Sequence, residues 1–120
     1  MKHIPSHAFT ARAAPGDFFT GEVWMEPQAP DIVRVTFTPG ARTAWHTHPQ
    51  GQTLLILAGR GRVQQRGAAA FDVTAGDVVQ IDPGEEHWHG AAPDALMTHL
   101  AIQAGETVWL RHVTDEEYGP

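Results

Sequence analysis

The sequence predicts an all-β fold, and two observations lead to this expectation. Nine prolines and twelve glycines divide the 120-residue chain into short segments, which leaves little room for ordinary helices of about ten residues or more. Each of these segments is bounded by Gly, Pro or Asp, as β-strands commonly are. Many short strands with turns at short spacing are typical of a β-sandwich or a small barrel.

At least one turn residue separates each expected strand from the next. The expected strands cover residues 22–25, 32–38, 44–48, 52–58, 62–65, 70–73, 78–81, 87–90, 96–103 and 107–112. The residues that separate them include, in chain order, Pro30, Gly40, Gly51, Gly59, Gly67, Gly76, Gly84, Pro93 and Gly105. Glycine and proline favour turns because glycine reaches left-handed conformations and proline lacks the N–H group that a β-ladder needs.

Length and composition narrow the class of protein. A chain of 120 residues, 42% hydrophobic and 18% charged, fits one globular domain spanning residues 1–120. The net charge is −6 and the eight basic residues are scattered, which argues against a nucleic-acid-binding face. Cysteine is absent, and there is no apolar run of about 18 residues that would cross a membrane. We therefore expect a cytoplasmic protein that binds neither nucleic acid nor membranes.

Side-chain alternation gathers histidines on particular strand faces. Alternate residues of a strand point to the same side, so His46 shares a face with His48, and His87 shares one with His89. Three further sets that share a face are Met97, His99, Ala101 and Gln103; Val33, Val35 and Phe37; and Gln52, Leu54, Ile56 and Ala58.

The strand at 52–58 is apolar on both faces, because Leu55 and Leu57 point away from the side of Gln52. A barrel strand of this kind needs a second cover on its outer face. The N- and C-terminal strands or another subunit would supply it, so we expect a homodimer or homotetramer.

The histidines of the strand-rich middle suggest a metal site. His46-Thr47-His48 places two imidazoles on one side of a strand, and a third imidazole from an adjacent strand completes a facial trio for a divalent metal. The alternative is a buried polar cluster without metal, but unpaired buried polar groups are costly. The three histidines of the terminal segments, His3, His7 and His112, are interpreted as ordinary polar residues.

Two motifs resemble those of the cupin family. Gly40, five residues, His46, one residue, His48, three residues, Gln52, six residues and Gly59 match the first motif, with Gln52 in place of the usual glutamate. "GDVVQIDPGEEH", residues 76–87, resembles the second, although its proline is shifted and the usual asparagine is replaced by Ala91. Motifs and flanking strands cover residues 33–103. The resemblance implies a double-stranded β-helix, or jelly-roll barrel, with one divalent metal held by His46, His48, Gln52 and His87.

The expected ligand set carries no negative charge. Three imidazoles and an amide leave the charge of the ion uncompensated, so such a site is a strong Lewis acid. Imidazole suits Mn, Fe, Zn, Co and Ni, and the amide oxygen favours a harder six-coordinate ion, with Mn first. Because the histidines must be neutral to bind, we expect the metal to leave below about pH 6.

A closer resemblance covers most of the chain. "PGARTAWHTHPQGQTLLILAGRG", "GDVVQIDPGEEHWHGAAPDALMTHLAIQ" and "HVTDEEYG" are similar to the small bacterial manganese cupins that act as hydroxynitrile lyases. This implies cleavage of a cyanohydrin into an aldehyde or ketone and hydrogen cyanide, or the reverse. The catalytic base is expected to be a histidine that titrates near neutrality. His99 is the first candidate for this base and His89 is the second. The alternative role for His99 is to orient a metal-ligating imidazole. The expected substrate pocket contains Val33, Val35, Thr43 and Gln103.

Other functions and roles stay open on the sequence. A cupin metal enzyme of another class, either a sugar-acid isomerase or a dioxygenase, is one alternative, and a non-catalytic metal or small-molecule binding module is another. Trp45 and Trp88 face away from the neighbouring ligands and are expected to pack between sheets or at a subunit contact. Arg42 either holds an anionic substrate or caps its loop.

Overall fold

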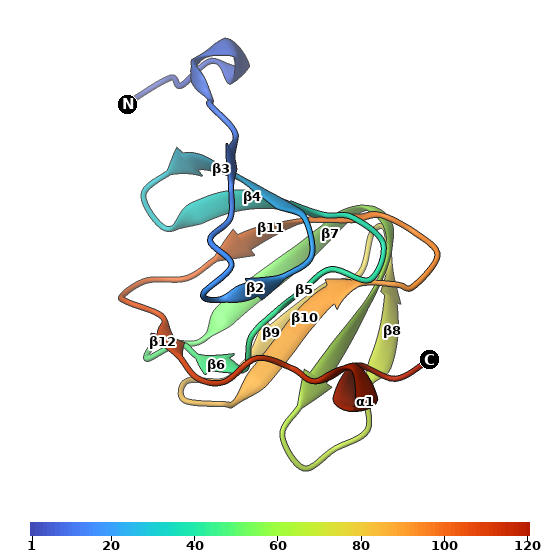
Figure 1. Ribbon diagram of the computed structural model, residues 1–120. Helices are drawn as coiled ribbons and strands as arrows, with labels where there is room; N and C mark the ends of the chain where they lie inside the picture. Colours follow the sequence, from blue (N-terminus) through green and yellow to red (C-terminus); the bar gives the residue numbers. More distant parts are fainter.

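Two antiparallel sheets form the body of the protein, in a computed structural model that describes residues 1–120 (Figure 1). The first sheet contains, in spatial order, β1 (Arg12–Ala13), β3 (Val23–Ala29), β4 (Ile32–Phe37), β11 (Met97–Ile102), the first half of β7 (Gln52–Gln65) and β9 (Val78–Ile81). The second sheet contains β2 (Phe19–Thr20), β5 (Arg42–Thr43), β10 (His87–Ala91), the second half of β7 and β8 (Phe71–Thr74), with β6 (His46–Thr47) and β12 (Val108–Trp109) joined beside β10. The expected jelly-roll barrel is therefore confirmed.

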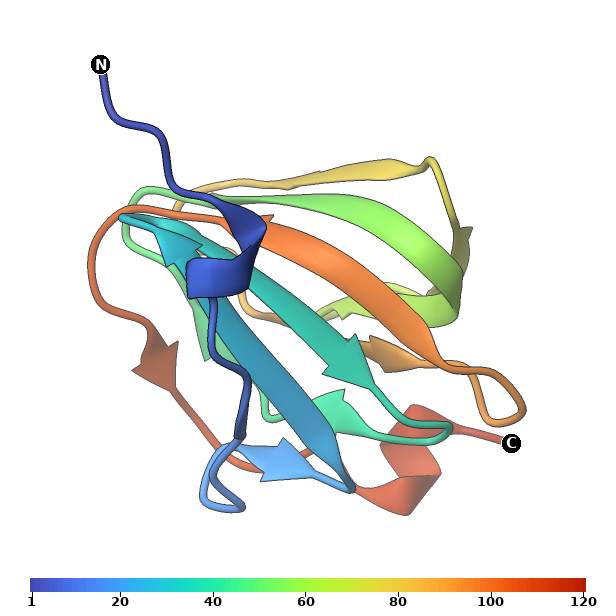
Figure 2. The same ribbon diagram turned by 90° about the horizontal axis from the view of Figure 1, so that it is seen from above.

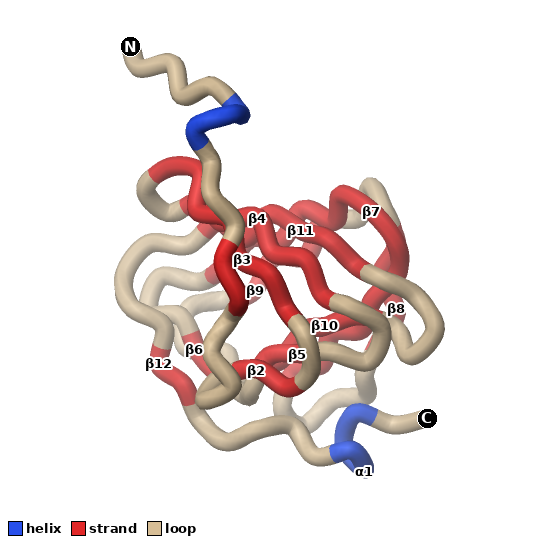
Figure 3. The backbone as a smooth tube through the Cα atoms, turned by 45° about the horizontal axis from the view of Figure 1, so that its top comes forward, coloured by secondary structure: helices blue, strands red, loops and turns tan.

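Helices occur only at the two ends of the chain (Figure 3): the 3-10 helix η1 (Ser6–Ala8) and the helix α1 (Asp115–Tyr118). Neither is long and apolar enough to cross a membrane. The segment before β1 projects away from both sheets (Figures 1 and 3).

Strand β7 links the two sheets through a sharp bend (Figure 2). Two strands, 52–58 and 62–65, were expected here with a turn at Gly59, and the structure instead has one strand of 14 residues. Gly59 has φ +75°, and a Cβ atom at this position would lie 1.7 Å from the carbonyl oxygen of Leu96. Glycine therefore lets the strand bend and pass close to its neighbour without ending.

The core lies between the sheets and is formed by the inward face of each strand. Phe37, Leu54 and Met97 have no exposed surface, and each comes from the face that side-chain alternation predicts. Burying a side chain of this size contributes about 1.5–3 kcal/mol. The sequence missed the two-residue strands β1, β2 and β5 because segments so short carry no alternation to read.

A second, smaller core lies on the outer side of the second sheet. Trp45 and Trp88 pack there with Val113 and Tyr118. They face away from the histidines as expected, but the expectation that they lie between the sheets is wrong, because the C-terminal segment covers them. Helix α1 is fixed in place by a capping box in which Thr114 and Glu117 bond to each other's backbone N–H groups. Such a box satisfies N–H groups that a helix start otherwise leaves free.

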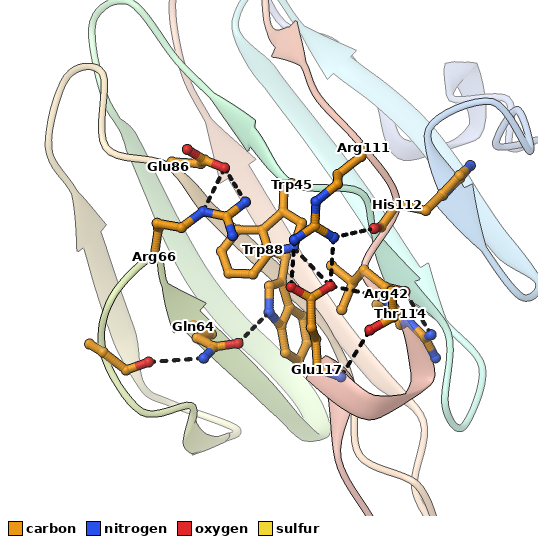
Figure 4. Close-up of polar contacts among 12 residues, drawn as sticks. Arg42, Trp45, Gln64, Arg66, Glu86, Trp88, Arg111, His112, Thr114 and Glu117 are labelled. Carbon is orange, nitrogen blue, oxygen red and sulfur yellow. Dashed lines mark hydrogen bonds and ion pairs between the residues drawn. The ribbon is translucent and has the colours of Figure 1, made fainter.

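Arginines surround this second core (Figure 4). Arg111 makes a two-pronged ion pair with Glu117 at 2.7 Å for each contact. Arg66 pairs with Glu86 and lies over the ring of Trp45, 3.9 Å from its centroid. Nε1 of Trp45 donates to Oε1 of Glu117 at 3.4 Å, which holds helix α1 against the residue that precedes His46.

The outer face of the first sheet carries exposed apolar side chains. Leu57 is 45% exposed and Val78 is 58% exposed, and Leu55 and Leu100 are neighbours across β7 and β11. Of the two residues that led us to expect a cover, Leu55 is half-buried and Leu57 stays exposed.

Candidate metal centre

Neighbouring strands β6 and β10 bring the expected imidazoles together. His46 and His87 are direct partners in the antiparallel ladder, and their ring centroids are 4.2 Å apart. The ring of His48 lies 4.9 Å from that of His46 and 5.5 Å from that of His87. A nitrogen from each of His46, His87 and His89 lies within 4.8 Å of the others. This trio contains two of the three expected ligand histidines, with His89 in place of His48, and the ring of His48 lies beside it.

Backbone carbonyls fix which nitrogen of each ring can bind a metal. Nδ1 of His46 lies 2.8 Å from the carbonyl oxygen of Ala44, and Nδ1 of His87 lies 2.8 Å from that of Glu85. A carbonyl oxygen only accepts, so the proton sits on Nδ1 and Nε2 keeps its lone pair. Metal-bound histidines commonly have a partner of this kind at the other ring nitrogen.

Gln52 reaches the same cluster from the start of β7. Its Oε1 lies 3.0 Å from Nε2 of His87. Because the proton of His87 is on Nδ1, Nε2 is an acceptor like Oε1, and the two atoms cannot form a hydrogen bond with each other. A shared cation resolves this contact, since two ligand atoms about 2.1 Å from one ion and at right angles lie about 3.0 Å apart. Nε2 of His48 is buried without a hydrogen-bond partner, which also suits a ligand. These residues therefore fit a divalent metal.

Burial keeps the cluster neutral. It lowers the pKa of His46, His87 and His89, and it lowers the pKa of His48 to about 4, with the neighbouring His87 adding to the effect. A neutral imidazole is the form that binds metal. The metal was expected to leave below about pH 6, from the pKa of unperturbed histidines. With these lowered pKa values, protons displace the metal only at a more acidic pH.

His99 and His89 form a buried pair beside this cluster. Nε2 of His99 lies 3.0 Å from Nδ1 of His89. Burial lowers the pKa of His99 to about 4, so the expected titration near neutrality is wrong for the metal-free protein. The remaining nitrogens, Nε2 of His89 and Nδ1 of His99, are buried without a partner.

A cavity of about 80 Å³ opens onto these rings. All four expected pocket residues line it, namely Val33, Val35, Thr43 and Gln103, together with His46, His48, Gln52, His89 and His99. Oγ1 of Thr43 accepts a hydrogen bond from the backbone N–H of His89 at 3.2 Å. No acidic side chain lines the cavity, so the charge of a bound cation is left uncompensated, as the neutral ligand set predicts.

Apart from Phe37, the sequence did not single out the aromatic residues that line this cavity. Trp109 lies 4.9 Å from the ring of His46 and stacks on Phe18 at 4.8 Å, while Phe19 and Phe37 complete the wall. Trp109 lies within the expected strand 107–112, but only residues 108 and 109 form a strand there. In the expected six-residue strand, Trp109 shares its face with Thr107 and Arg111, so alternation did not mark that face as inward.

Arg42 lies outside the cavity. It is only 6% exposed, and its guanidinium donates to the carbonyl oxygens of Gly40 and Val113 and to Asp115. It also lies over the ring of Tyr118, 4.7 Å from its centroid. Of its two possible roles, the structure supports anchoring the loop and the C-terminal segment.

Comparison with known proteins gives a consistent result. The Cupin domain family matches residues 33–103. An (R)-mandelonitrile lyase from Granulicella tundricola is 56% identical over 98% of this chain and 97% of its own. The crystal structure of a cupin-like protein from Thermotoga maritima superposes with a TM-score of 0.86, at 44% identity, over 88% of this chain and 89% of that one. An acireductone dioxygenase from a Picosynechococcus species is 30% identical over 62% of this chain and 44% of its own.

Proposed function

The chain belongs to the cupin family, and from this premise we propose that it is a metal-dependent hydroxynitrile lyase. The reaction is the cleavage of a cyanohydrin into an aldehyde or ketone and hydrogen cyanide, or the reverse addition. The observation that carries the proposal is 56% identity over nearly the whole chain with an (R)-mandelonitrile lyase. The buried cluster of neutral imidazoles provides the chemistry that such a reaction needs.

His46, His48, Gln52 and His87 would hold one divalent metal per chain, with Mn favoured and Fe, Zn, Co or Ni as alternatives. When bound, the metal supplies a Lewis acid that lowers the pKa of a substrate hydroxyl. The absence of acidic side chains from the cavity supports this role, because nothing there neutralises the ion. Mn is favoured by the amide oxygen of Gln52.

The pair formed by His99 and His89 would move the proton. The cyanohydrin loses its hydroxyl proton to an imidazole nitrogen of the pair, the bond to cyanide breaks as the carbonyl forms, and the same pair returns a proton to cyanide. Atoms and charge balance, since one cyanohydrin gives one carbonyl compound and one hydrogen cyanide. The 3.0 Å contact between the two rings lets them share a proton.

The cavity wall suits an aromatic substrate. Phe19, Phe37 and Trp109 offer ring faces and edges beside the imidazole cluster, and aromatic rings favour stacked or edge-on contacts. Val33 and Val35 shape the side of the cavity that β4 provides, while Thr43 and Gln103 offer polar groups to the substrate or to cyanide.

The test is a paired measurement on one purified sample. Metal content is determined by mass spectrometry, and cyanide release from (R)- and (S)-mandelonitrile is followed before and after chelation. We expect about one metal per chain and release that chelation abolishes and Mn²⁺ restores. Metal without release above buffer would refute the lyase function while leaving the metal centre in place.

A dioxygenase is the second candidate, favoured by the partial match to an acireductone dioxygenase. That match covers 62% of this chain. It therefore carries less weight than the match to the (R)-mandelonitrile lyase, which covers 98% of this chain. Oxygen consumption by the iron-loaded protein with an acireductone would favour it. Turnover of an unsaturated uronate would instead indicate a sugar-acid isomerase, and binding without any turnover would indicate a binding module.

We further propose a homodimer or homotetramer that works in the cytoplasm, with residues 1–120 as one cupin domain. Leu55, Leu57, Val78 and Leu100 on the outer face of the first sheet support a contact between copies, because exposed apolar patches favour association. Light scattering after size exclusion tests this, and a particle of 13.1 kDa would contradict it.

A further inference from the structure

We propose that Gln103 is a positioning residue, which turns the amide of Gln52 so that its oxygen faces the metal. This inference rests on the proposed function only in requiring that the cluster bind a metal. Nε2 of Gln52 donates to Oε1 of Gln103 at 3.0 Å. The other end of the same amide, Oε1, faces Nε2 of His87 at 3.0 Å. Gln103 therefore acts through Gln52, and the role is additional to its place in the pocket wall.

An amide ligand needs this help, and a carboxylate does not. The two oxygens of a glutamate are equivalent, so either end of the group can face a cation. An amide has one acceptor end and one donor end, and turning it by 180° would point its N–H groups at the ion. An acceptor on the far side of Gln52 favours the orientation with its oxygen toward the ion, because the N–H groups then have a partner and a buried N–H group needs one.

The fold fixes both members of this contact. Gln52 is 5% exposed at the first position of β7, and Gln103 follows directly after β11. These strands are paired with Ile102 opposite Thr53, which places the two glutamines side by side. The backbone N–H of Gln103 donates to the carbonyl oxygen of Asp31 at 3.0 Å, so the backbone from which its side chain extends is anchored independently of Gln52.

A double-mutant cycle on metal affinity tests the inference. The dissociation constant for Mn²⁺ is measured by chelator competition for the wild type, Gln103→Met, Gln52→Glu and the variant with both changes. We expect Gln103→Met to weaken binding by roughly 10- to 100-fold in the wild-type background, as is usual for residues that orient metal ligands. In the Gln52→Glu background, where the ligand is symmetric, the same change should have an effect below about threefold.

Two further variants separate orientation from pocket shape. Gln103→Glu keeps an acceptor for the Gln52 amide and should bind Mn²⁺ at least as tightly as the wild type, whereas Gln103→Leu should behave like Gln103→Met. The visible absorption of Co²⁺-loaded protein should change with Gln103→Met and not with Gln103→Glu. An equal loss of affinity in both backgrounds, or no loss in either, would overturn the inference. A wild type that binds no metal would overturn the metal-dependent function as well.

Discussion

Nε2 of His99 lies 3.0 Å from Nδ1 of His89, so two neutral buried imidazoles share one hydrogen bond beside the candidate metal centre. One ring of such a pair donates and the other accepts. One nitrogen of His89 lies within 4.8 Å of nitrogens of His46 and His87. A change in the protonation of His99 therefore changes the hydrogen bonding of His89, which lines the cavity.

Replacing His99 tests whether this pair handles the proton. We expect His99→Ala to lower kcat for mandelonitrile cleavage by roughly 10²- to 10⁴-fold, the usual contribution of a general base. Its metal content should stay near the wild-type value, because His99 is not among the proposed ligands. Val35→Ala is a matched control, since it also removes a side chain from the cavity wall but has no titrating group. Equal losses in the two variants would contradict the role of His99.

His48 and His89 should differ in what their removal takes away. Nε2 of each is buried without a partner, so contacts within the protein do not tell the ligand from the proton carrier. On the proposed assignment, His48→Ala loses bound metal, whereas His89→Ala keeps it and loses turnover. Metal content after dialysis, measured side by side with cyanide release, checks both. Metal lost from His89→Ala and kept by His48→Ala would reverse the assignment.

The stability of the chelated protein should fall in mildly acidic solution. The pKa of His99 is about 4 in the folded protein and near 6.5 when unfolded. Between pH 6.5 and pH 4, His99 binds a proton in the unfolded state but not in the folded state. The free energy of unfolding therefore falls as the pH drops through this range. Below pH 4 both states are protonated, and His99 causes no further fall. The loss from His99 is on the order of 3 kcal/mol.

Urea unfolding at a series of pH values measures this loss, and His99→Leu is the control because it has no proton to gain. The variant should show a shallower fall in the same window, with the other buried histidines accounting for what remains. A free energy of unfolding that is equal at pH 7 and pH 4.5 would contradict the prediction.

Side-chain alternation predicted much of the site, and barrel closure determined the rest. His46 with His48, and His99 with Gln103, line the cavity as their spacing predicts. His48 and Gln103 lie one residue beyond β6 and β11, so the alternation continues past the ends of these strands. The contact between His89 and His99 joins β10 to β11, and these strands are not paired with each other. Its distance depends on how the two sheets close, which no local pattern records. The hydrogen bond from Gln52 to Gln103 depends likewise on the register between β7 and β11.

Arg42 provides a test in which stability and activity should separate. Its guanidinium donates to the carbonyl oxygen of Val113 at 2.9 Å and to Asp115 at 2.8 Å. Arg42→Met leaves a buried acceptor without a partner, which costs about 1–3 kcal/mol. Because Arg42 does not line the cavity, kcat and KM should be unchanged at temperatures where the variant is folded.

Arg60→Met is the matched control for this change. The ion pair of Arg60 with Asp94 is exposed, with 54% of one side chain and 74% of the other in solvent, and such pairs contribute about 0–1 kcal/mol. Urea unfolding of both variants measures the difference, and cyanide release measures activity. If Arg42→Met has wild-type stability but a raised KM, the guanidinium binds the substrate instead of anchoring the C-terminal segment. Loss of an anchoring residue should lower the free energy of unfolding and leave KM unchanged.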